Sequence, residues 1–182
     1  MMEQNLETTV ALLQRTPAAL DALLRGLPQE WIARNEGEGT WSATEIVGHL
    51  AHAEITDWMP RVRWLLEIGE SQPSPPFDRT GFRKLIEGRE TGAVLDDFAR
   101  LRARSLEELA ALGLTPVEMT RTGRHPAFGT VTLSELLATW AAHDANHVHH
   151  LARVLAHQYR QAVGPWSAFL GVMHCDGHSA NG

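Results

Sequence analysis

Apolar residues recur along this chain every three or four positions, the spacing of amphipathic helices, in four long segments. The first segment spans residues 3–25. Pro17 lacks the amide hydrogen that an interior helical turn needs, so Thr16 and Pro17 predict either one kinked helix or two abutting helices. No segment alternates apolar and polar residues convincingly enough to predict a strand.

The second segment begins at a capping box. In the run from Ser42 to Glu45, the serine hydroxyl can accept a hydrogen bond from the Glu45 amide, while the glutamate carboxylate can accept one from the serine amide. We therefore expect a helix from Ser42 to about Glu67, bent in its middle by Pro60.

Another capping box, from Thr132 to Glu135, predicts the start of the last long helix. We expect this helix to continue to about Tyr159. A short helix is expected to follow it, around residues 165–173.

The remaining long helix is predicted from about Ala93 to Leu112, where Gly113 ends it. Two connections flank this helix. Residues 69–79 contain three prolines and indicate a loop, and residues 115–131 contain two prolines and two glycines and look irregular.

Four long helical segments without strands predict an all-α fold, a four-helix bundle in which residues 69–92 and 113–131 serve as crossovers or lids. No internal repeat of the length that signals a solenoid is present. We assign residues 1–173 to a single domain and expect residues 174–182 to form a mobile tail.

The composition is that of an ordinary globular protein, with 43% hydrophobic and 21% charged residues among 182. The net charge of −6 is spread along the chain, without the clustered basic face that nucleic-acid binding needs. No apolar run reaches the roughly 18–20 residues of a membrane-spanning helix. Cys175 is the only cysteine, and the first ten residues lack the features of a signal peptide, so we expect the reducing cytoplasm.

Ten histidines against one tyrosine are the unusual feature of the composition. His143 and His147 are four residues apart on the last helix, so their side chains lie within about 40° of each other, one turn apart. The zinc motif H-E-x-x-H uses the same spacing. His49 lies at the edge of the apolar stripe of the Ser42 helix and would supply a third imidazole. Three protein ligands are the number expected of a catalytic metal site with an open position.

Several polar residues near this cluster leave alternatives open. His150 is three residues after His147 and could form a rival pair, whereas His52 lies farther outward on its helix. Asp144 falls on the inner face and is expected to hydrogen-bond a ligand imidazole. Asp144 and Glu54 are the two candidates for acid–base catalysis.

Structural roles are the simpler interpretation for most other notable residues. Asp57 and Arg61, four residues apart, predict a structural ion pair, and His125, His149 and His157 have no partner at metal-binding spacing. Five tryptophans are interpreted as core or pocket wall: Trp41, Trp58, Trp64, Trp140 and Trp166.

Apolar residues outside the inner stripe of the Ser42 helix bear on association. Ile55, Trp58 and Met59 exceed what one amphipathic face can bury. We therefore expect a homodimer that forms through helix faces.

Three segments of the chain resemble the signature regions of the DinB/YfiT-like metalloenzyme superfamily, in particular its DinB-like branch. They are WSATEIVGHLAHAE, RTGRHPAFGTVTLSELLATW and AAHDANHVHHLARVLA. The order and spacing of these segments match the family's paired W-S-x-x-E-x-x-x-H-L and H-D-x-x-H helices. The resemblance extends from about residue 8 to about residue 170.

The resemblance implies a four-helix bundle, often dimeric, whose three histidines bind zinc, nickel or a similar divalent ion. Carried over residue by residue, the metal ligands are His49, His143 and His147, and His150 is not among them. Zinc or nickel is expected, with iron or manganese as alternatives, because imidazole suits several divalent metals.

The resemblance also implies an activity. Characterised members transfer low-molecular-weight thiols to electrophiles, or isomerise or hydrolyse thiol conjugates, so we expect a small-molecule thiol and an electrophilic substrate. Cys175 lies beyond the bundle and is not expected to be the nucleophile. The alternatives are a metal-dependent hydrolase that activates water at the same site, and a non-catalytic module that binds metal or a small ligand in a stress response.

Overall fold

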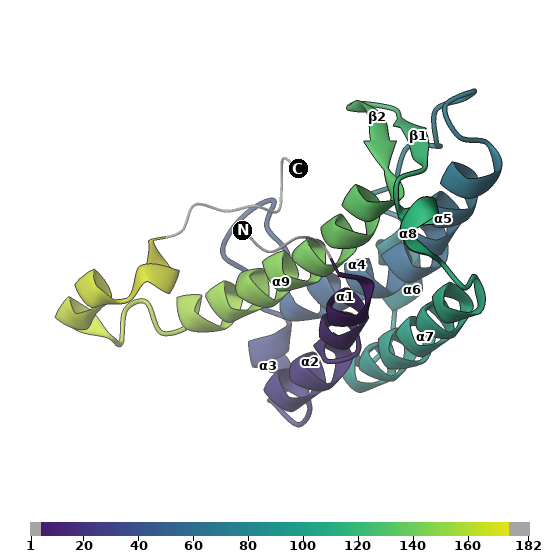
Figure 1. Ribbon diagram of the computed structural model, residues 1–182. Coiled ribbons are helices and arrows are strands. Elements are labelled where there is room, and N and C mark those ends of the chain that lie inside the picture. The colour runs from purple at the N-terminus through teal and green to yellow at the C-terminus, as the bar shows by residue number, and fades with distance from the viewer. Residues whose placement is uncertain (1–4, 175–182) are drawn as a thin grey trace.

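The computed structural model describes residues 5–174, and over this range the chain is helical apart from one β-hairpin (Figure 1). The elements, in chain order, are α1 (Leu6–Leu13), α2 (Thr16–Leu24), α3 (Gln29–Ile32), α4 (Ala43–Thr56), α5 (Trp58–Glu67), α6 (Phe82–Ile86), α7 (Thr91–Ala111), α8 (Pro116–Met119), β1 (Thr122–His125), β2 (Gly129–Thr132), α9 (Leu133–His157) and the 3-10 helices η1 (Gly164–Phe169) and η2 (Gly171–Met173).

The four long segments form a four-helix bundle, as predicted. The segments are α1 with α2, α4 with α5, α7 alone and α9 alone. α4 packs against both α7 and α9, α1 packs against α9, and α2 packs against α7 and α9. One apolar cluster includes Leu50, Phe98 and Leu151, and a second includes Val62 and Trp140. Figure 1 shows α9 as the long central helix, with η1 and η2 beyond its C-terminal end.

Both predicted capping boxes are present. The Ser42 amide donates to Glu45 Oε2 (2.8 Å), and the Thr132 amide donates to Glu135 Oε2 (2.7 Å), while each hydroxyl accepts from the glutamate amide. The boxes fix where α4 and α9 begin. They therefore place His49 about two turns into its helix and His143 about three turns into its helix.

The two proline-containing segments are each divided into two helices. α1 ends at Leu13 and α2 begins at Thr16, which selects the abutting pair. The single bent helix expected across Pro60 is wrong, because α4 ends at Thr56 and α5 begins only after Asp57 (φ −117°, ψ −67°). A proline ring clashes with the carbonyl four residues earlier, here that of Thr56, so the helix breaks there.

The break at Asp57 also corrects the expected exposure of the residues after it. Ile55 is exposed, but only 3% of Trp58 and 2% of Met59 are accessible to solvent. The new helix starts with a different phase and turns both side chains into the core. Of the three residues, Ile55 alone still supports a homodimer, which stays a prediction. Light scattering at micromolar concentration tests it.

The connections contain more regular structure than predicted. β1 and β2 form an antiparallel hairpin that pairs Thr122 with Thr132 and His125 with Gly129, where an irregular segment was expected. Most of the hairpin is exposed or half-buried, so its sequence shows no alternation of apolar and polar residues. The helices α3, α6 and α8 were missed because four or five residues are too few to show a period.

The other predicted elements agree more closely with the structure. α7 spans the predicted third helix and is followed by Gly113, whose positive φ of 57° ends it. Two short 3-10 helices occupy the region predicted as one short helix. The predicted mobile tail falls, apart from His174, outside the described residues.

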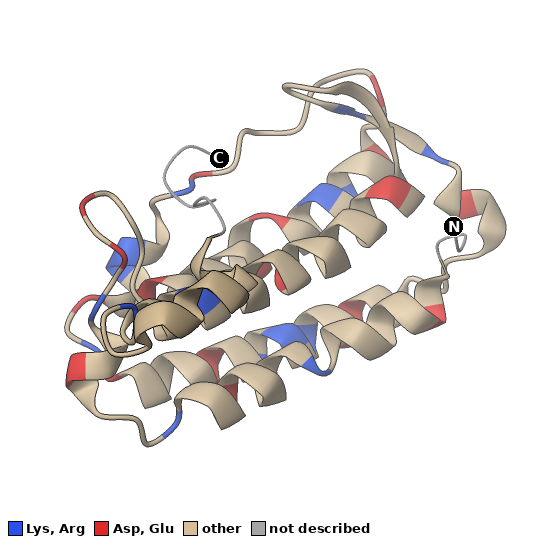
Figure 2. Cartoon of the chain, turned by 90° about the vertical axis from the view of Figure 1, so that its left-hand side faces the viewer, with Lys and Arg blue, Asp and Glu red and all other residues tan. Residues whose placement is uncertain are grey.

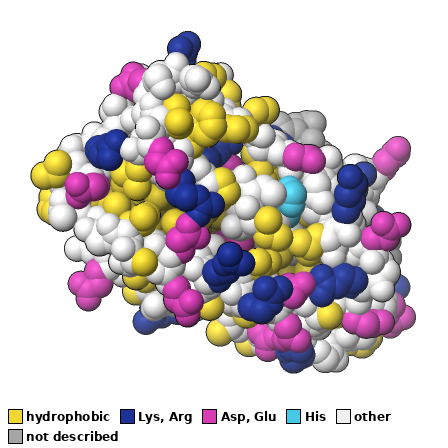
Figure 3. Space-filling view, turned by 90° about the vertical axis from the view of Figure 1, so that its right-hand side faces the viewer, with side chains coloured by type: hydrophobic (Ala, Val, Ile, Leu, Met, Phe, Trp, Pro, Cys, Tyr) yellow, Lys and Arg dark blue, Asp and Glu magenta, His cyan; other side chains and the backbone are white. Residues whose placement is uncertain are grey.

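The surface of the bundle carries charges of both signs. Basic and acidic residues are interspersed along the helices (Figure 2), and apolar side chains show between charged ones on the side where α5 and α7 lie in Figure 1 (Figure 3). None of the described helices combines the length and the apolar character that crossing a membrane requires.

Candidate metal centre

Three histidines from two neighbouring helices meet at one point. His49 comes from α4, and His143 and His147 come from α9. The Nε2 atom of His143 lies 3.1 Å from that of His49 and 3.2 Å from that of His147. Within the described part of the chain, these are the three side chains whose ligand atoms lie close enough together to hold a metal ion. The structure thus brings together the histidines that the spacing selected.

The distances between the nitrogens fit a metal ion. Imidazole nitrogens bind zinc at about 2.0–2.1 Å, so two ligands at tetrahedral angles are separated by about 3.3 Å. The separations of 3.1 and 3.2 Å are close to this value. The Nε2 atoms therefore face one another and are the candidate ligand atoms. The Nδ1 atoms of His49 and His143 are buried and have no hydrogen-bond partner.

The electrostatics of the site keep the imidazoles of His49 and His143 neutral. Burial lowers the pKa of His49 to about 2, and the neighbouring His147 and His143 lower it further. Burial likewise lowers the pKa of His143 to about 3, with a further contribution from His147. Neutral imidazole is the form that binds metal, so protons do not compete for these nitrogens near pH 7.

The lowered pKa values predict that the metal-free protein loses stability in mild acid. In the unfolded chain these histidines titrate near 6.5, the ordinary pKa of a solvated imidazole, whereas in the fold they stay neutral down to about 2 or 3. Below pH 6.5 the unfolded state binds more protons, so the free energy of unfolding falls with pH, by up to about 1.4 kcal/mol per pH unit for each histidine. Urea unfolding between pH 7 and pH 5 measures this slope.

A matched variant assigns the slope to these two residues. Replacing His49 and His143 together with glutamine should reduce the slope over the same range, leaving the smaller contribution of groups such as His125, whose pKa burial also lowers. A wild-type free energy of unfolding that stays constant from pH 7 to pH 5 would contradict the buried, neutral state of the two rings.

Tryptophan side chains surround the three imidazoles. The Trp41 ring lies 4.8 Å from the His49 ring and is stacked on the His147 ring at 6.1 Å. The Trp58 ring meets the His143 ring edge-on at 5.1 Å. Both tryptophans therefore form pocket wall or core, as predicted. Their apolar surface lowers the local dielectric and strengthens any electrostatic interaction inside the site.

Two phenylalanines that the sequence reasoning missed complete this wall. Phe77, in the loop after α5, lies edge-on to His49 at 5.5 Å, and Phe82 of α6 lies edge-on to it at 6.2 Å. α6 approaches closely because Gly48 faces it: a Cβ at Gly48 would lie 2.4 Å from Ile86 Cγ2. The loop and the short helix had no periodic pattern that could have revealed these contacts.

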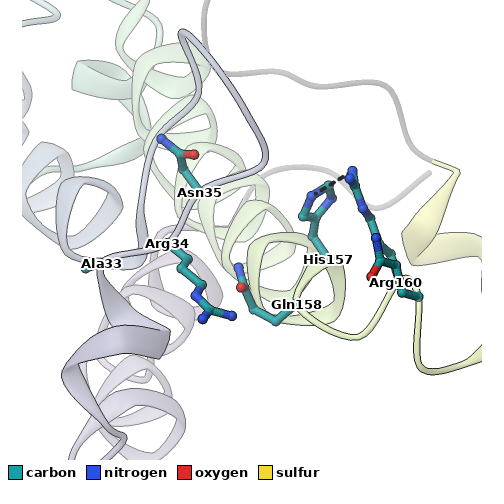
Figure 4. A pocket seen from close by; sticks show the side chains of 7 residues that line it. Ala33, Arg34, Asn35, His157, Gln158 and Arg160 are labelled. Carbon is teal, nitrogen blue, oxygen red and sulfur yellow. Dashed lines mark hydrogen bonds between the residues drawn. The ribbon is translucent and has the colours of Figure 1, made fainter.

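The other histidines among residues 5–174 lie outside the three-histidine group. His52 Nε2 contacts the carbonyl oxygen of Asp78 at 3.1 Å. His150 is fully buried, with its Nε2 atom 4.0 Å from a carboxylate oxygen of Glu36. His157 lines a separate surface hollow of about 320 Å³ at the end of α9, where Arg160 donates to its Nε2 atom (Figure 4).

The two acid–base candidates are held by an arginine of α7. Asp144 accepts two hydrogen bonds from Arg102, at 2.6 and 2.9 Å, and Glu54 Oε1 accepts two more, at 2.7 and 2.9 Å. The expected hydrogen bond from a ligand imidazole to Asp144 is wrong, because the buried Nδ1 atom of His143 has no partner. Asp144 follows His143 by one residue, about 100° around the helix, and so faces α7 instead of the imidazoles.

The predicted ion pair between Asp57 and Arg61 is confirmed. Arg61 also donates to Ser74 Oγ at 3.1 Å and to the carbonyl oxygen of Pro75. The pair thus holds the proline-rich loop against α5. Trp166 corrects the interpretation of the tryptophans, since 71% of it is exposed.

Comparison with known proteins agrees with this fold. The family model described as the DinB superfamily matches residues 12–151. A proposed metal-dependent hydrolase of Oceanobacillus iheyensis is 24% identical over 143 residues, which cover 76% of this chain and 79% of that protein.

Two solved structures share the architecture. YfiT from Bacillus subtilis, described as a probable metal-dependent hydrolase with an unusual four-helix bundle topology, superposes with a TM-score of 0.70 at 20% identity, over 85% of this chain and 87% of that one. The four-helix bundle protein TT2238 superposes with a TM-score of 0.56 at 26% identity, over 81% and 98% of the two chains.

Proposed function

The chain belongs to the DinB superfamily, and we propose that it is a metal-dependent enzyme that transfers a low-molecular-weight thiol to an electrophile. His49, His143 and His147 would hold one divalent ion, with zinc or nickel as the first candidates. The observation that carries the proposal is the convergence of the three Nε2 atoms within a wall of aromatic side chains.

The residues of the site suit activation of a nucleophile. A divalent ion there would act as a Lewis acid and lower the pKa of a thiol or water in the remaining coordination position. Three neutral imidazoles leave the charge of such an ion uncompensated, so they favour an anionic fourth ligand. The rings of Trp41, Trp58 and Phe77 pack against the imidazoles and would limit the access of bulk water to a bound ion.

A specific observation favours a thiol over water as the nucleophile. No carboxylate among the described residues belongs to the three-histidine group, and Glu54 and Asp144 are engaged with Arg102. Attack by water usually needs a general base, whereas a thiol, with a pKa near 8.5, ionises more readily without one. The thiol would lose its proton to solvent, its sulfur would form the bond to the electrophilic carbon, and the leaving group would depart with the electron pair of the broken bond.

Metal-dependent hydrolysis is the second candidate. It is favoured by the names of two relatives, the Oceanobacillus iheyensis protein and YfiT. In that reaction water would take the place of the thiol, and its proton would have to pass to solvent or to the leaving group.

One experiment separates these reactions. Metal in freshly purified protein is quantified, the protein is stripped, and it is reloaded with zinc, nickel or cobalt. Each form is assayed with cysteine and glutathione against 1-chloro-2,4-dinitrobenzene, and separately with p-nitrophenyl acetate in the absence of thiol. We expect conjugation above the uncatalysed rate only in a metal-loaded form. Metal-dependent ester hydrolysis without conjugation would replace the proposal with the hydrolase, and binding of metal without either activity would replace it with a binding module.

A further inference from the structure

A buried arginine joins the two helices that carry the three histidines. Arg102 lies in the middle of α7 and is only 1% exposed. Its guanidinium binds Glu54 of α4 through Nε and Nη2 and binds Asp144 of α9 through Nη1 and Nη2, with all four distances between 2.6 and 2.9 Å. One rigid, planar group therefore spans α4 and α9.

The two carboxylates sit close to the histidines in sequence. Glu54 is five residues after His49, about one and a half turns along the same helix. Asp144 directly follows His143. A displacement of either carboxylate relative to Arg102 is thus carried to an imidazole by the backbone of a continuous helix.

A second set of contacts leads from the same arginine to His143. The indole nitrogen of Trp140 donates to Glu54 Oε1 at 3.2 Å, and the Trp140 ring lies 5.3 Å from the Arg102 guanidinium carbon. Trp140 is stacked on Trp58 at 5.6 Å, and Trp58 contacts His143. The arginine network and the histidine group are therefore linked by close packing as well as along the helices.

From this arrangement we propose that Arg102 is a positioning residue for the metal centre, and that it sets the affinity and coordination geometry of the bound ion by fixing α4 against α9. The inference rests on the proposed metal centre. Replacing a buried ion network with apolar residues of similar volume is often neutral or stabilising, so stability alone does not explain why this network is present. The network does restrict relative movement of the helices, and metal coordination tolerates errors of only about 0.2 Å in ligand distances.

The test uses cobalt as the probe, because its visible absorption reports the number and geometry of its ligands. Two variants are compared with the wild type: Arg102→Lys, which keeps the charge but lacks the planar fork, and a triple variant, Arg102→Met with Glu54→Leu and Asp144→Leu, which removes the network without leaving an unpaired charge. Cobalt affinity is measured by competition with a chelator, and stability of the metal-free protein by urea unfolding.

We expect the triple variant to stay folded and to bind cobalt about 10- to 100-fold more weakly, the loss typical of residues that orient metal ligands, with an altered absorption spectrum. Arg102→Lys should shift affinity and spectrum in the same direction by a smaller amount. Arg25→Met, which breaks the ion pairs with Asp21 of α2 and Asp96 of α7, is the control and should keep the wild-type spectrum.

The outcomes test the positioning role of Arg102 separately from the metal centre itself. Wild-type cobalt affinity and spectrum in Arg102→Lys, or in a folded triple variant, would overturn the positioning role while leaving the metal centre intact. A wild type that binds no stoichiometric cobalt would overturn the metal centre, and the positioning role with it. If the triple variant does not fold, Arg102→Lys decides alone.

Discussion

Replacing His147 with alanine should abolish stoichiometric metal binding while the bundle stays folded. The substitution removes one of three protein ligands, and two imidazoles do not complete a stable site for zinc or nickel. We expect a loss in affinity of at least about 100-fold, more than the 10- to 100-fold typical of residues that only orient ligands. The fold should survive because its two apolar clusters do not depend on the metal. Elemental analysis after dialysis measures the bound metal, and circular dichroism measures whether the bundle stays folded.

His52 supplies the matched control for this experiment. It lies three residues after His49 on α4, but its ring contacts Asp78 rather than the other imidazoles. His52→Ala should therefore retain one equivalent of metal. If a variant without His49, His143 and His147 also retained one equivalent, the assignment of the site would be wrong. Loss of metal with full retention of activity would leave the site in place and remove its catalytic role.

The parts of this site that could be predicted from sequence are those encoded within one helix. The capping boxes at Ser42 and Thr132 fixed where two helices begin, because the partners of each bond are three residues apart. The spacing of His143 and His147 fixed their common face. These signals depend only on local geometry, which tertiary packing did not change.

The parts that could not be predicted depend on contacts between distant segments. Arg102 is 48 residues from Glu54 and 42 residues from Asp144. The sequence showed that Asp144 faces inward, but it could not show which side chain of another helix Asp144 and Glu54 meet. Phe77 and Phe82 reach His49 from a loop and a short helix, neither of which has a repeating pattern.

The sequence also did not distinguish buried tryptophans from exposed ones. Replacing the buried Trp140 should cause the largest loss of stability. Trp140→Ala should lower the free energy of unfolding by about 3–5 kcal/mol, since the side chain is fully buried and its removal leaves a cavity. The variant also loses the stacking on Trp58 and the hydrogen bond to Glu54, which leaves a buried carboxylate with one donor fewer. Urea unfolding of the metal-free protein measures the change.

Two further variants separate the causes of this loss. Trp140→Phe keeps most of the volume but removes the indole donor, so it should cost about 1–2 kcal/mol, because Glu54 Oε1 loses one of its donors and keeps the two bonds from Arg102. Trp166→Ala removes the same type of side chain from a position that is 71% exposed and should change stability by less than about 0.5 kcal/mol. Equal losses for Trp140→Ala and Trp166→Ala would mean that Trp140 does not fill the core. A Trp140→Phe variant as unstable as Trp140→Ala would instead assign the loss to the bond with Glu54, and so to the network around Arg102.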